Sequence, residues 1–145
     1  MILKRVLKAG VTLLFCLSLF ISQNQSIEAS SDNGLYKIRC TCYIINGITA
    51  SGHKTRPGII AGKKEDIGKI AALYQIDKDG SLGEFIGYYE FLDTGSGIDT
   101  DGDGKGDSIK KGLSVDVWQP SLKDAKEWIK QYGDYVYIKI IEGEG

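Results

Sequence analysis

Alternating apolar and polar positions dominate the chain after residue 34 and predict β-strands. The clearest runs, rich in Ile, Val, Tyr and Phe, cover residues 35–45, 58–62, 70–76, 83–92, 113–118 and 134–141. Turn residues separate several of them, as at Asn46-Gly47 and at Asp77-Lys78-Asp79-Gly80. Six short strands with glycine-rich connections predict a mainly β domain.

One segment has helical rather than alternating periodicity. Ser121 suits the N-cap position, and Asp124 follows three residues later, as in a capping box. An apolar stripe at helical spacing comprises Leu122, Ala125, Trp128 and Ile129. Gly133 is expected to end this helix, and residues 63–68 are expected to form a single helical turn. Because no helix separates each pair of strands, a small closed barrel fits better than a wound parallel sheet.

The first 29 residues have a different composition from the rest. A basic start (Lys4, Arg5 and Lys8) precedes an apolar run over residues 11–21, and Ile27-Glu28-Ala29 resembles a cleavage site. This is the layout of a secretory signal peptide, and the run is short for a membrane span. We therefore expect a signal peptide at 1–29, a linker at 30–35, one domain at 36–141 and a tail at 142–145. The alternative is an uncleaved N-terminal anchor.

The charge balance limits the class of partner. The chain has 18 basic and 19 acidic side chains, and without Lys4, Arg5, Lys8 and Glu28 the remainder has 15 against 18. A nucleic-acid-binding protein would show a basic excess, which this chain lacks. There is also no polybasic cluster for anionic lipid. We expect an exported monomer that binds no nucleic acid and keeps no membrane span after signal cleavage.

Two cysteines, Cys40 and Cys42, remain in the expected domain. Residues two apart in a strand point to the same face, and a disulfide between such close neighbours would be strained. The pair is too sparse for a zinc site, since His53 is the chain's single histidine. The pattern favours two small apolar residues on one strand face, with a redox or intermolecular disulfide role as the alternative.

Asp116 is the first candidate for a working carboxylate. It lies in a strand where Leu113, Val115 and Val117 alternate with Ser114, Asp116 and Trp118. Aspartate is a poor β-former, so its position on the polar face mildly favours a role in a cleft. Trp118 beside it is either core or a platform for stacking sugar rings. Asp93 is the second candidate, although turn formation alone also explains Asp93-Thr94-Gly95.

The loop between these two aspartates has the spacing of a calcium-binding loop. Asp99, Asp101, Asp103 and Asp107 stand at positions 1, 3, 5 and 9 of an EF-hand-type loop, with the Lys105 carbonyl at position 7. Position 12, where a bidentate glutamate is expected, is Lys110. The sequence therefore predicts a weak Ca²⁺ site, with a flexible acidic loop that holds no ion as the alternative.

An ordered set of short motifs carries a family resemblance. In sequence order these are Thr49-Ala50-Ser51-Gly52, Arg56-Pro57-Gly58, Asp93-Thr94-Gly95, Ile109-Lys110-Lys111-Gly112, Val115-Asp116-Val117 and Pro120-Ser121. A short helix and the strand of residues 136–140 follow them. Together they resemble the three-aspartate (3D) domain of bacterial cell-wall enzymes, the module found in the catalytic core of lytic transglycosylase A. The resemblance spans roughly residues 36–141.

The resemblance implies a fold and a set of roles. The implied fold is a six-stranded double-psi β-barrel with one helix in its C-terminal half. Asp116 would be the catalytic acid and base, with Asp93 beside it. Thr49, Ser51 and either Lys110 or Lys111 would bind substrate, and Trp118 is a further candidate from its place beside Asp116. The family's first aspartate would follow the strand at residues 60–62; here it is absent or displaced to Asp66, and about a dozen residues are inserted after Asp93-Thr94-Gly95.

These expectations lead to three competing functions. The first is a secreted peptidoglycan-cleaving enzyme, a lytic transglycosylase of the MurNAc–GlcNAc bond that requires no cofactor for its chemistry. The second is a non-catalytic module that binds cell-wall glycan on the same barrel, and the third is a small exported structural or interaction protein. Peptidoglycan strands are the expected partner in the first two cases.

Overall fold

The computed structural model describes residues 34–142 and confirms a mainly β domain with six strands and one α-helix. The elements are β1 (Leu35–Tyr43), β2 (Ile59–Gly62), the 3₁₀ turn η2 (Lys64–Asp66), β3 (Ile70–Ile76), β4 (Leu82–Thr94), β5 (Ser114–Trp118), α1 (Leu122–Tyr132) and β6 (Tyr135–Ile141). The predicted boundaries agree within a few residues. The main difference is β4, which runs on through Asp93 and Thr94 where the sequence predicts a turn.

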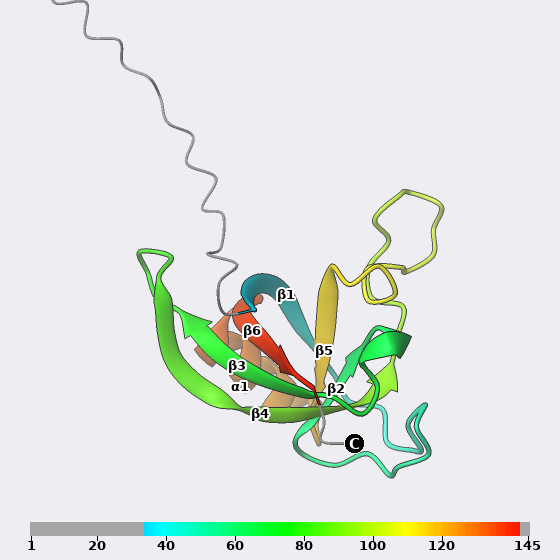
Figure 1. Ribbon diagram of the computed structural model, residues 1–145. Coiled ribbons are helices and arrows are strands. Elements are labelled where there is room, and N and C mark those ends of the chain that lie inside the picture. The colour runs from blue at the N-terminus through cyan, green and yellow to red at the C-terminus, as the bar shows by residue number, and fades with distance from the viewer. Residues whose placement is uncertain (1–33, 143–145) are drawn as a thin grey trace, which may run out of the picture.

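The six strands pair in the order β1-β5-β2-β4-β3-β6, and β6 returns to β1, so the sheet closes into a barrel (Figure 1). β5 is parallel to β1 and β4 is parallel to β2, whereas the other four pairs are antiparallel. The parallel pairs join segments that are far apart in sequence. This closure brings strand β1 against β5, where Asp116 lies.

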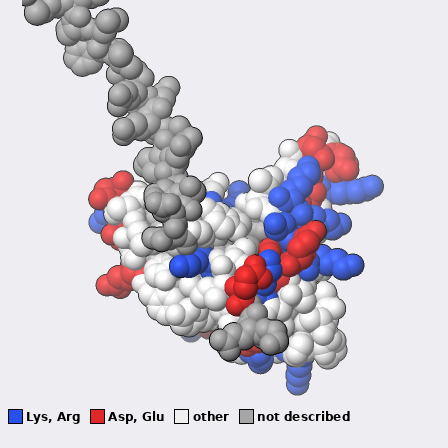
Figure 2. All heavy atoms as spheres, viewed as in Figure 1, with Lys and Arg blue, Asp and Glu red and all other residues white. Residues whose placement is uncertain are grey.

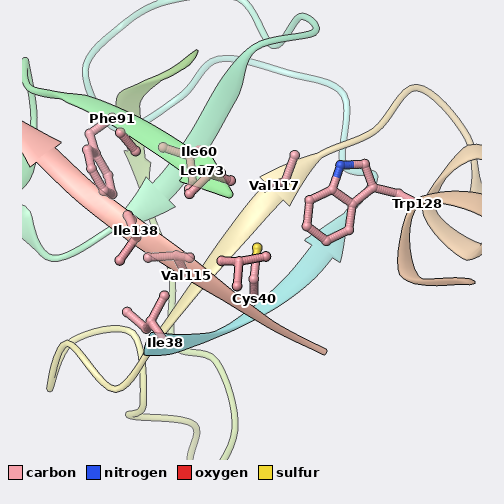
Figure 3. Close-up of a cluster of buried hydrophobic side chains, with 11 residues drawn as sticks. Ile38, Cys40, Ile60, Leu73, Phe91, Val115, Val117, Trp128 and Ile138 are labelled. Carbon is pink, nitrogen blue, oxygen red and sulfur yellow. The ribbon is translucent and has the colours of Figure 1, made fainter. Parts of the chain in front are cut away.

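The main core fills the barrel with alternate residues of the strands (Figure 3). On β1 these are Ile38 and Cys40, and on β5 they are Val115 and Val117. Because side chains alternate across a strand, the intervening residues of β1 and β5 face out of the barrel. Asp116 therefore points away from the apolar face of β5, as predicted. Leu113 is exposed and does not extend that face.

Helix α1 begins and ends as its sequence predicts. The Ser121 hydroxyl accepts a hydrogen bond from the Asp124 N–H, and Gly133 follows the last turn with a φ of 79°. Ala125 and Trp128 are buried, and Figure 3 shows Trp128 directed toward Val117 in the main core. Leu122, expected in the apolar stripe, is 56% exposed, because the helix rests on the barrel through its later turns.

Cys40 and Cys42 are free thiols. Both pack with the main core, as expected for small apolar residues on one face of a strand. Burial and the nearby Asp116 carboxylate raise the pKa of the Cys42 thiol to about 12. A thiol with so high a pKa is a weak nucleophile at neutral pH, which disfavours the redox alternative.

The predicted signal peptide at residues 1–29 lies outside the described residues, as do most of the predicted linker and tail. Within residues 34–142, no helix has the length and apolar character needed to cross a membrane.

Candidate functional site

The two candidate aspartates stand on either side of Ala61. Ala61 is the register partner of Asp93 across the β2–β4 pair and of Asp116 across the β2–β5 pair. Side chains of register partners project to the same face of a sheet, and adjacent strands lie about 4.8 Å apart. The two carboxylates therefore share one face, two strand spacings apart, with only a methyl group between them.

A register shift in β4 makes this arrangement possible. Ile60 pairs with Phe91, yet the next residue, Ala61, pairs with Asp93, so Leu92 is the extra residue of a bulge. An extra residue reverses the face to which the following side chains point. Leu92 consequently packs in a second small core cluster, and Asp93 turns to the face that Asp116 occupies.

Both aspartates line a cleft of about 510 Å³ on this outer face of the barrel. Its walls are residues of β1, β2, β4 and β5 together with two connecting segments. The lining residues are Arg39, Thr41, Tyr43, Ile45, Gly47, Ile48, Thr55, Ala61, Asp93, Thr94, Gly95, Ser96, Gly97, Ile98, Ser114 and Asp116. Asp93 and Asp116 thus line one cleft, whereas Thr49, which was expected to line it with them, does not.

Asp116 is held by the neighbouring strand. Thr41 is its register partner on β1, and the Thr41 Oγ1 hydroxyl donates a hydrogen bond to Asp116 Oδ1. Burial against the barrel raises the pKa of the Asp116 carboxyl above its ordinary value of 3.8. Desolvation disfavours the charged form of a carboxyl group, so Asp116 has the environment of a carboxylic acid that gives up its proton reluctantly.

Asp93 has a different environment because it is hydrogen-bonded on both oxygens. Oδ1 accepts from the backbone N–H groups of Ala50 and Thr94, each at 2.9 Å, and Oδ2 accepts from the Tyr43 hydroxyl at 3.0 Å. Burial and then the hydrogen bond to Asp93 raise the pKa of Tyr43 well above its ordinary range. These three donors fix the orientation of the Asp93 carboxylate and occupy both of its oxygens.

Thr49 and Ser51 support this site from behind and do not line the cleft, contrary to their predicted role in binding substrate. The Thr49 side chain is buried and accepts a hydrogen bond from the His53 N–H. The Ser51 hydroxyl donates to the Leu92 carbonyl at 2.6 Å. Together they hold the turn in which Ala50 presents its N–H to Asp93. Their hydroxyls are used up by these internal hydrogen bonds.

Two further residues that were expected to bind substrate do not line the cleft. Trp118 is 5% exposed and packs with Ile59 and Leu92, and its indole N–H donates to the Ile45 carbonyl, so it is core rather than a sugar platform. Lys110 is exposed and lies outside the set of residues that line the cleft. Strand alternation placed Trp118 on the face of Asp116, but the loop carrying Ile45 covers it.

Gly62 ends β2, the strand after which the first aspartate of the resembled domain was expected. A Cβ atom added to Gly62 would lie 2.4 Å from a ring carbon of Phe91, so the packing leaves no room for any side chain there. Asp66, the possible replacement, is buried in η2 and bonds Lys69 Nζ at 3.4 Å. It is not among the residues that line the cleft. The cleft therefore has two aspartates.

The acidic loop lies beside the cleft and is folded by its own hydrogen bonds. Asp99 accepts three backbone N–H bonds, from Asp101, Gly102 and Gly104, which lower the pKa of its carboxyl group. Carboxylate oxygens of Asp99, Asp101 and Asp103 lie within 4.8 Å of one another. Figure 2 shows acidic side chains at the tip of this loop with basic ones next to them. Such a group of oxygens could hold a cation.

Lys111 supplies an internal cation to the same loop. Its Nζ forms ion pairs with Asp107 and with Asp101, the second at 3.1 Å, and it also donates to the Thr100 hydroxyl. The Lys111 ammonium and the Thr100 hydroxyl lower the pKa of Asp107 to about 2. The expected position-9 ligand of a calcium loop is thus engaged by a lysine in this structure.

The loop joins the barrel through a narrow neck. The Ile98 carbonyl accepts from the N–H groups of Asp107 and Ser108, at 2.9 and 3.1 Å. The Ser108 hydroxyl then bonds the Ser114 hydroxyl on β5 at 2.6 Å, and both serines are buried. The acidic tip is therefore separated from the cleft wall by a hydrogen-bonded closure.

The polar side chains that β1 contributes to the cleft were not singled out by the sequence. Arg39, Thr41 and Tyr43 alternate along β1 with the core positions and face the cleft. The sequence shows that these residues alternate with apolar positions. It does not show that their strand pairs with β5 and so places them in the cleft.

A comparison with protein-family models, with curated proteins and with solved structures finds no match to this chain.

Proposed function

We propose that this protein is a secreted enzyme that cleaves peptidoglycan as a lytic transglycosylase, with Asp116 as its acid and base. The observation that carries the proposal is a half-buried carboxyl group of raised pKa that lines an open cleft together with a second aspartate. A general acid needs its proton near neutral pH, and burial is one of the ways in which enzymes retain it. The motif resemblance supplies the substrate class.

The proposed reaction needs only one titrating carboxyl group. Asp116 gives its proton to the glycosidic oxygen as the bond from that oxygen to the MurNAc anomeric carbon breaks. The resulting Asp116 carboxylate then accepts the proton of the substrate's own 6-hydroxyl, whose oxygen bonds to the anomeric carbon. Asp116 ends protonated, as it began, and the product is a 1,6-anhydro sugar. Ordinary glycosidases instead use two carboxyl groups and a water molecule.

Asp93 has a supporting role in this proposal. Its carboxylate is engaged by Tyr43, Ala50 and Thr94 and is not free to shuttle a proton. A carboxylate across the cleft would favour the positive charge that develops on the sugar in the transition state. We place both residues on a double-psi β-barrel, a topology consistent with the two parallel strand pairs.

Calcium is a further part of the proposal. Ca²⁺ would bind the carboxylates of Asp99, Asp101 and Asp103, with the Lys105 carbonyl and Asp107 completing the set. Lys111 already neutralises part of this charge, so an entering ion must displace it, which is consistent with weak binding. The ion would stabilise the loop and take no part in the chemistry.

A glycan-binding module without activity is the second candidate. The specific observation in its favour is that Asp93 and Asp116 are the only acidic residues among the described residues that line the cleft, so a third aspartate is absent from it. Digestion of purified peptidoglycan with mass analysis of the soluble products separates the two. Anhydro-muropeptides that form with wild type and not with Asp116→Asn would establish the enzyme. Binding of peptidoglycan by wild type without any product would establish the module.

A further inference from the structure

Arg39 has no partner in the cleft. Among the described residues that line the cleft it is the only cation, and the carboxyl groups of Asp93 and Asp116 line the same cleft. Its Nε atom is buried and makes no hydrogen bond, and its guanidinium forms no ion pair with a described carboxylate. By contrast, Arg56 on the surface pairs with Glu90 at 2.7 Å.

An unpaired buried donor is costly, and a charged one more so. An arginine that only supports the fold would be expected to use its donors on carbonyl or carboxylate oxygens of its neighbours. Arg39 instead projects with Thr41 and Tyr43 from the outer face of β1 into the cleft. Its planar fork of donors suits a carboxylate, which can accept two parallel hydrogen bonds.

The position of Arg39 relative to Asp116 is fixed by strand register. Arg39 pairs with Ser114 and Thr41 pairs with Asp116, so Arg39 lies one same-face step along the β1–β5 pair from the proposed acid. Two residues of a strand span about 6.6 Å. A ligand with its scissile oxygen at Asp116 would therefore meet Arg39 with a group on the adjacent part of the same sugar ring.

We propose that Arg39 binds a free carboxylate on the sugar whose bond is cleaved, and that the cleft prefers glycan strands that lack stem peptides. The inference rests on the proposed function. In muramic acid the lactyl group stands on the ring carbon two positions from the anomeric centre, and it ends in a carboxylate only when no peptide is attached. In peptide-bearing strands that carboxylate is an amide and has no charge to offer Arg39.

The experiment compares two ligands that differ in this one group. Peptidoglycan strands stripped of stem peptides by an amidase carry the free lactyl carboxylate, and coupling with methylamine converts it to a neutral methylamide. Dissociation constants for both are measured on the full chain carrying Asp116→Asn, which prevents turnover. A charge-assisted bidentate contact predicts about tenfold tighter binding of the carboxylate form.

Variants then assign the preference to one residue. Adding Arg39→Gln should remove the difference between the two ligands, whereas adding Arg56→Gln, a matched change outside the cleft, should leave it intact. Thermal melts check that each variant folds; the comparison of ligands on the Asp116→Asn chain stands even if the Arg39 variant does not. Equal affinity for both strands overturns the inference alone, because the protein still binds glycan. Binding to neither strand overturns the inference and the proposed function together.

Discussion

Thr41 and Asp116 are direct register partners across the parallel β1–β5 pair, and the Thr41 hydroxyl donates a hydrogen bond to the Asp116 carboxylate. The contact spans 75 residues of sequence. It means that the proposed acid is oriented by a strand from the start of the domain rather than by its own flanking residues. The pKa and the position of Asp116 therefore depend on barrel closure.

The first prediction concerns cleavage. Asp116→Asn retains the size of the side chain and an oxygen that accepts from Thr41, but it cannot carry the proton. We expect a loss of two to four orders of magnitude in the rate of release of soluble muropeptides, the usual effect of removing a general acid. Asp93→Asn should reduce the rate less, because its oxygen can still accept from Ala50 and Thr94. Equal rates for wild type and Asp116→Asn would rule out Asp116 as the acid.

The second prediction concerns the pH dependence of cleavage. Thr41→Val removes the hydroxyl that stabilises the Asp116 carboxylate and keeps a similar shape, so the pKa of Asp116 should rise further. Because the protonated acid is the active form, the alkaline limb of the rate profile should move up by about one pH unit. Profiles of rate against pH for wild type and Thr41→Val test this. An unchanged or downward-shifted limb would contradict the assignment.

The third prediction concerns stability. The pKa of Asp116 is higher in the folded than in the unfolded chain, so ionisation of this group opposes folding as the pH rises through the folded value. Each unit of the difference costs about 1.4 kcal/mol of unfolding free energy above that pH. Asp116→Asn should accordingly melt at a higher temperature than wild type at pH 7. The advantage should shrink as the pH falls to 3.8, the ordinary value for aspartate. A destabilised variant at pH 7 would contradict the burial argument.

The fourth prediction concerns the position without a side chain. Gly62→Ala forces a methyl group against the Phe91 ring in the main core, and overpacking of this kind costs about 1–3 kcal/mol. The matched control is Gly47→Ala, where a Cβ meets nothing within 4 Å. Denaturant unfolding of both variants gives the comparison. If Gly62→Ala is as stable as the control, the core adapts to the added methyl group and the packing argument fails.

The fifth prediction concerns the acidic loop. Calcium at ten times its dissociation constant should stabilise the folded chain by about 1.4 kcal/mol, raising the melting temperature by several degrees. Magnesium should do less because it gives up its water reluctantly. Melts with calcium, magnesium or chelator are compared for wild type and the double variant Asp101→Ala with Asp103→Ala. A wild-type melting temperature that ignores calcium would reduce this loop to a solvated insert closed by Lys111.

Local pattern was sufficient to predict the elements. Alternation located all six strands, and the Ser121 cap with Gly133 bounded the helix, because these signals depend on residues close together in sequence. It also marked Asp116 as a polar residue opposite the core. Alternation and capping residues lie within single segments, so the sequence of each segment is enough to predict its element.

Long-range pairing was the information that the sequence lacked. The bulge at Leu92, which turns Asp93 into the cleft, depends on how β4 aligns with β2. Trp118 looked available for stacking because the segment around Ile45 that covers it is 73 residues away. The burial of Thr49 behind the cleft has the same origin. These three positions depend on contacts between distant segments, and the strand pattern does not show how those segments align.

The neck at Ile98, Asp107 and Ser108 makes the acidic loop a replaceable part. The neck closes before the chain reaches β5, so the entropy cost of closing the loop falls within the insert. This cost grows only slowly as a loop becomes longer. The tip could therefore be lengthened, shortened or exchanged among descendants of a common ancestor without moving Ser114 or the residues that follow it. Any effect of an ion on the loop could then change separately from the role of the cleft, and an engineer could graft another recognition loop at the same point.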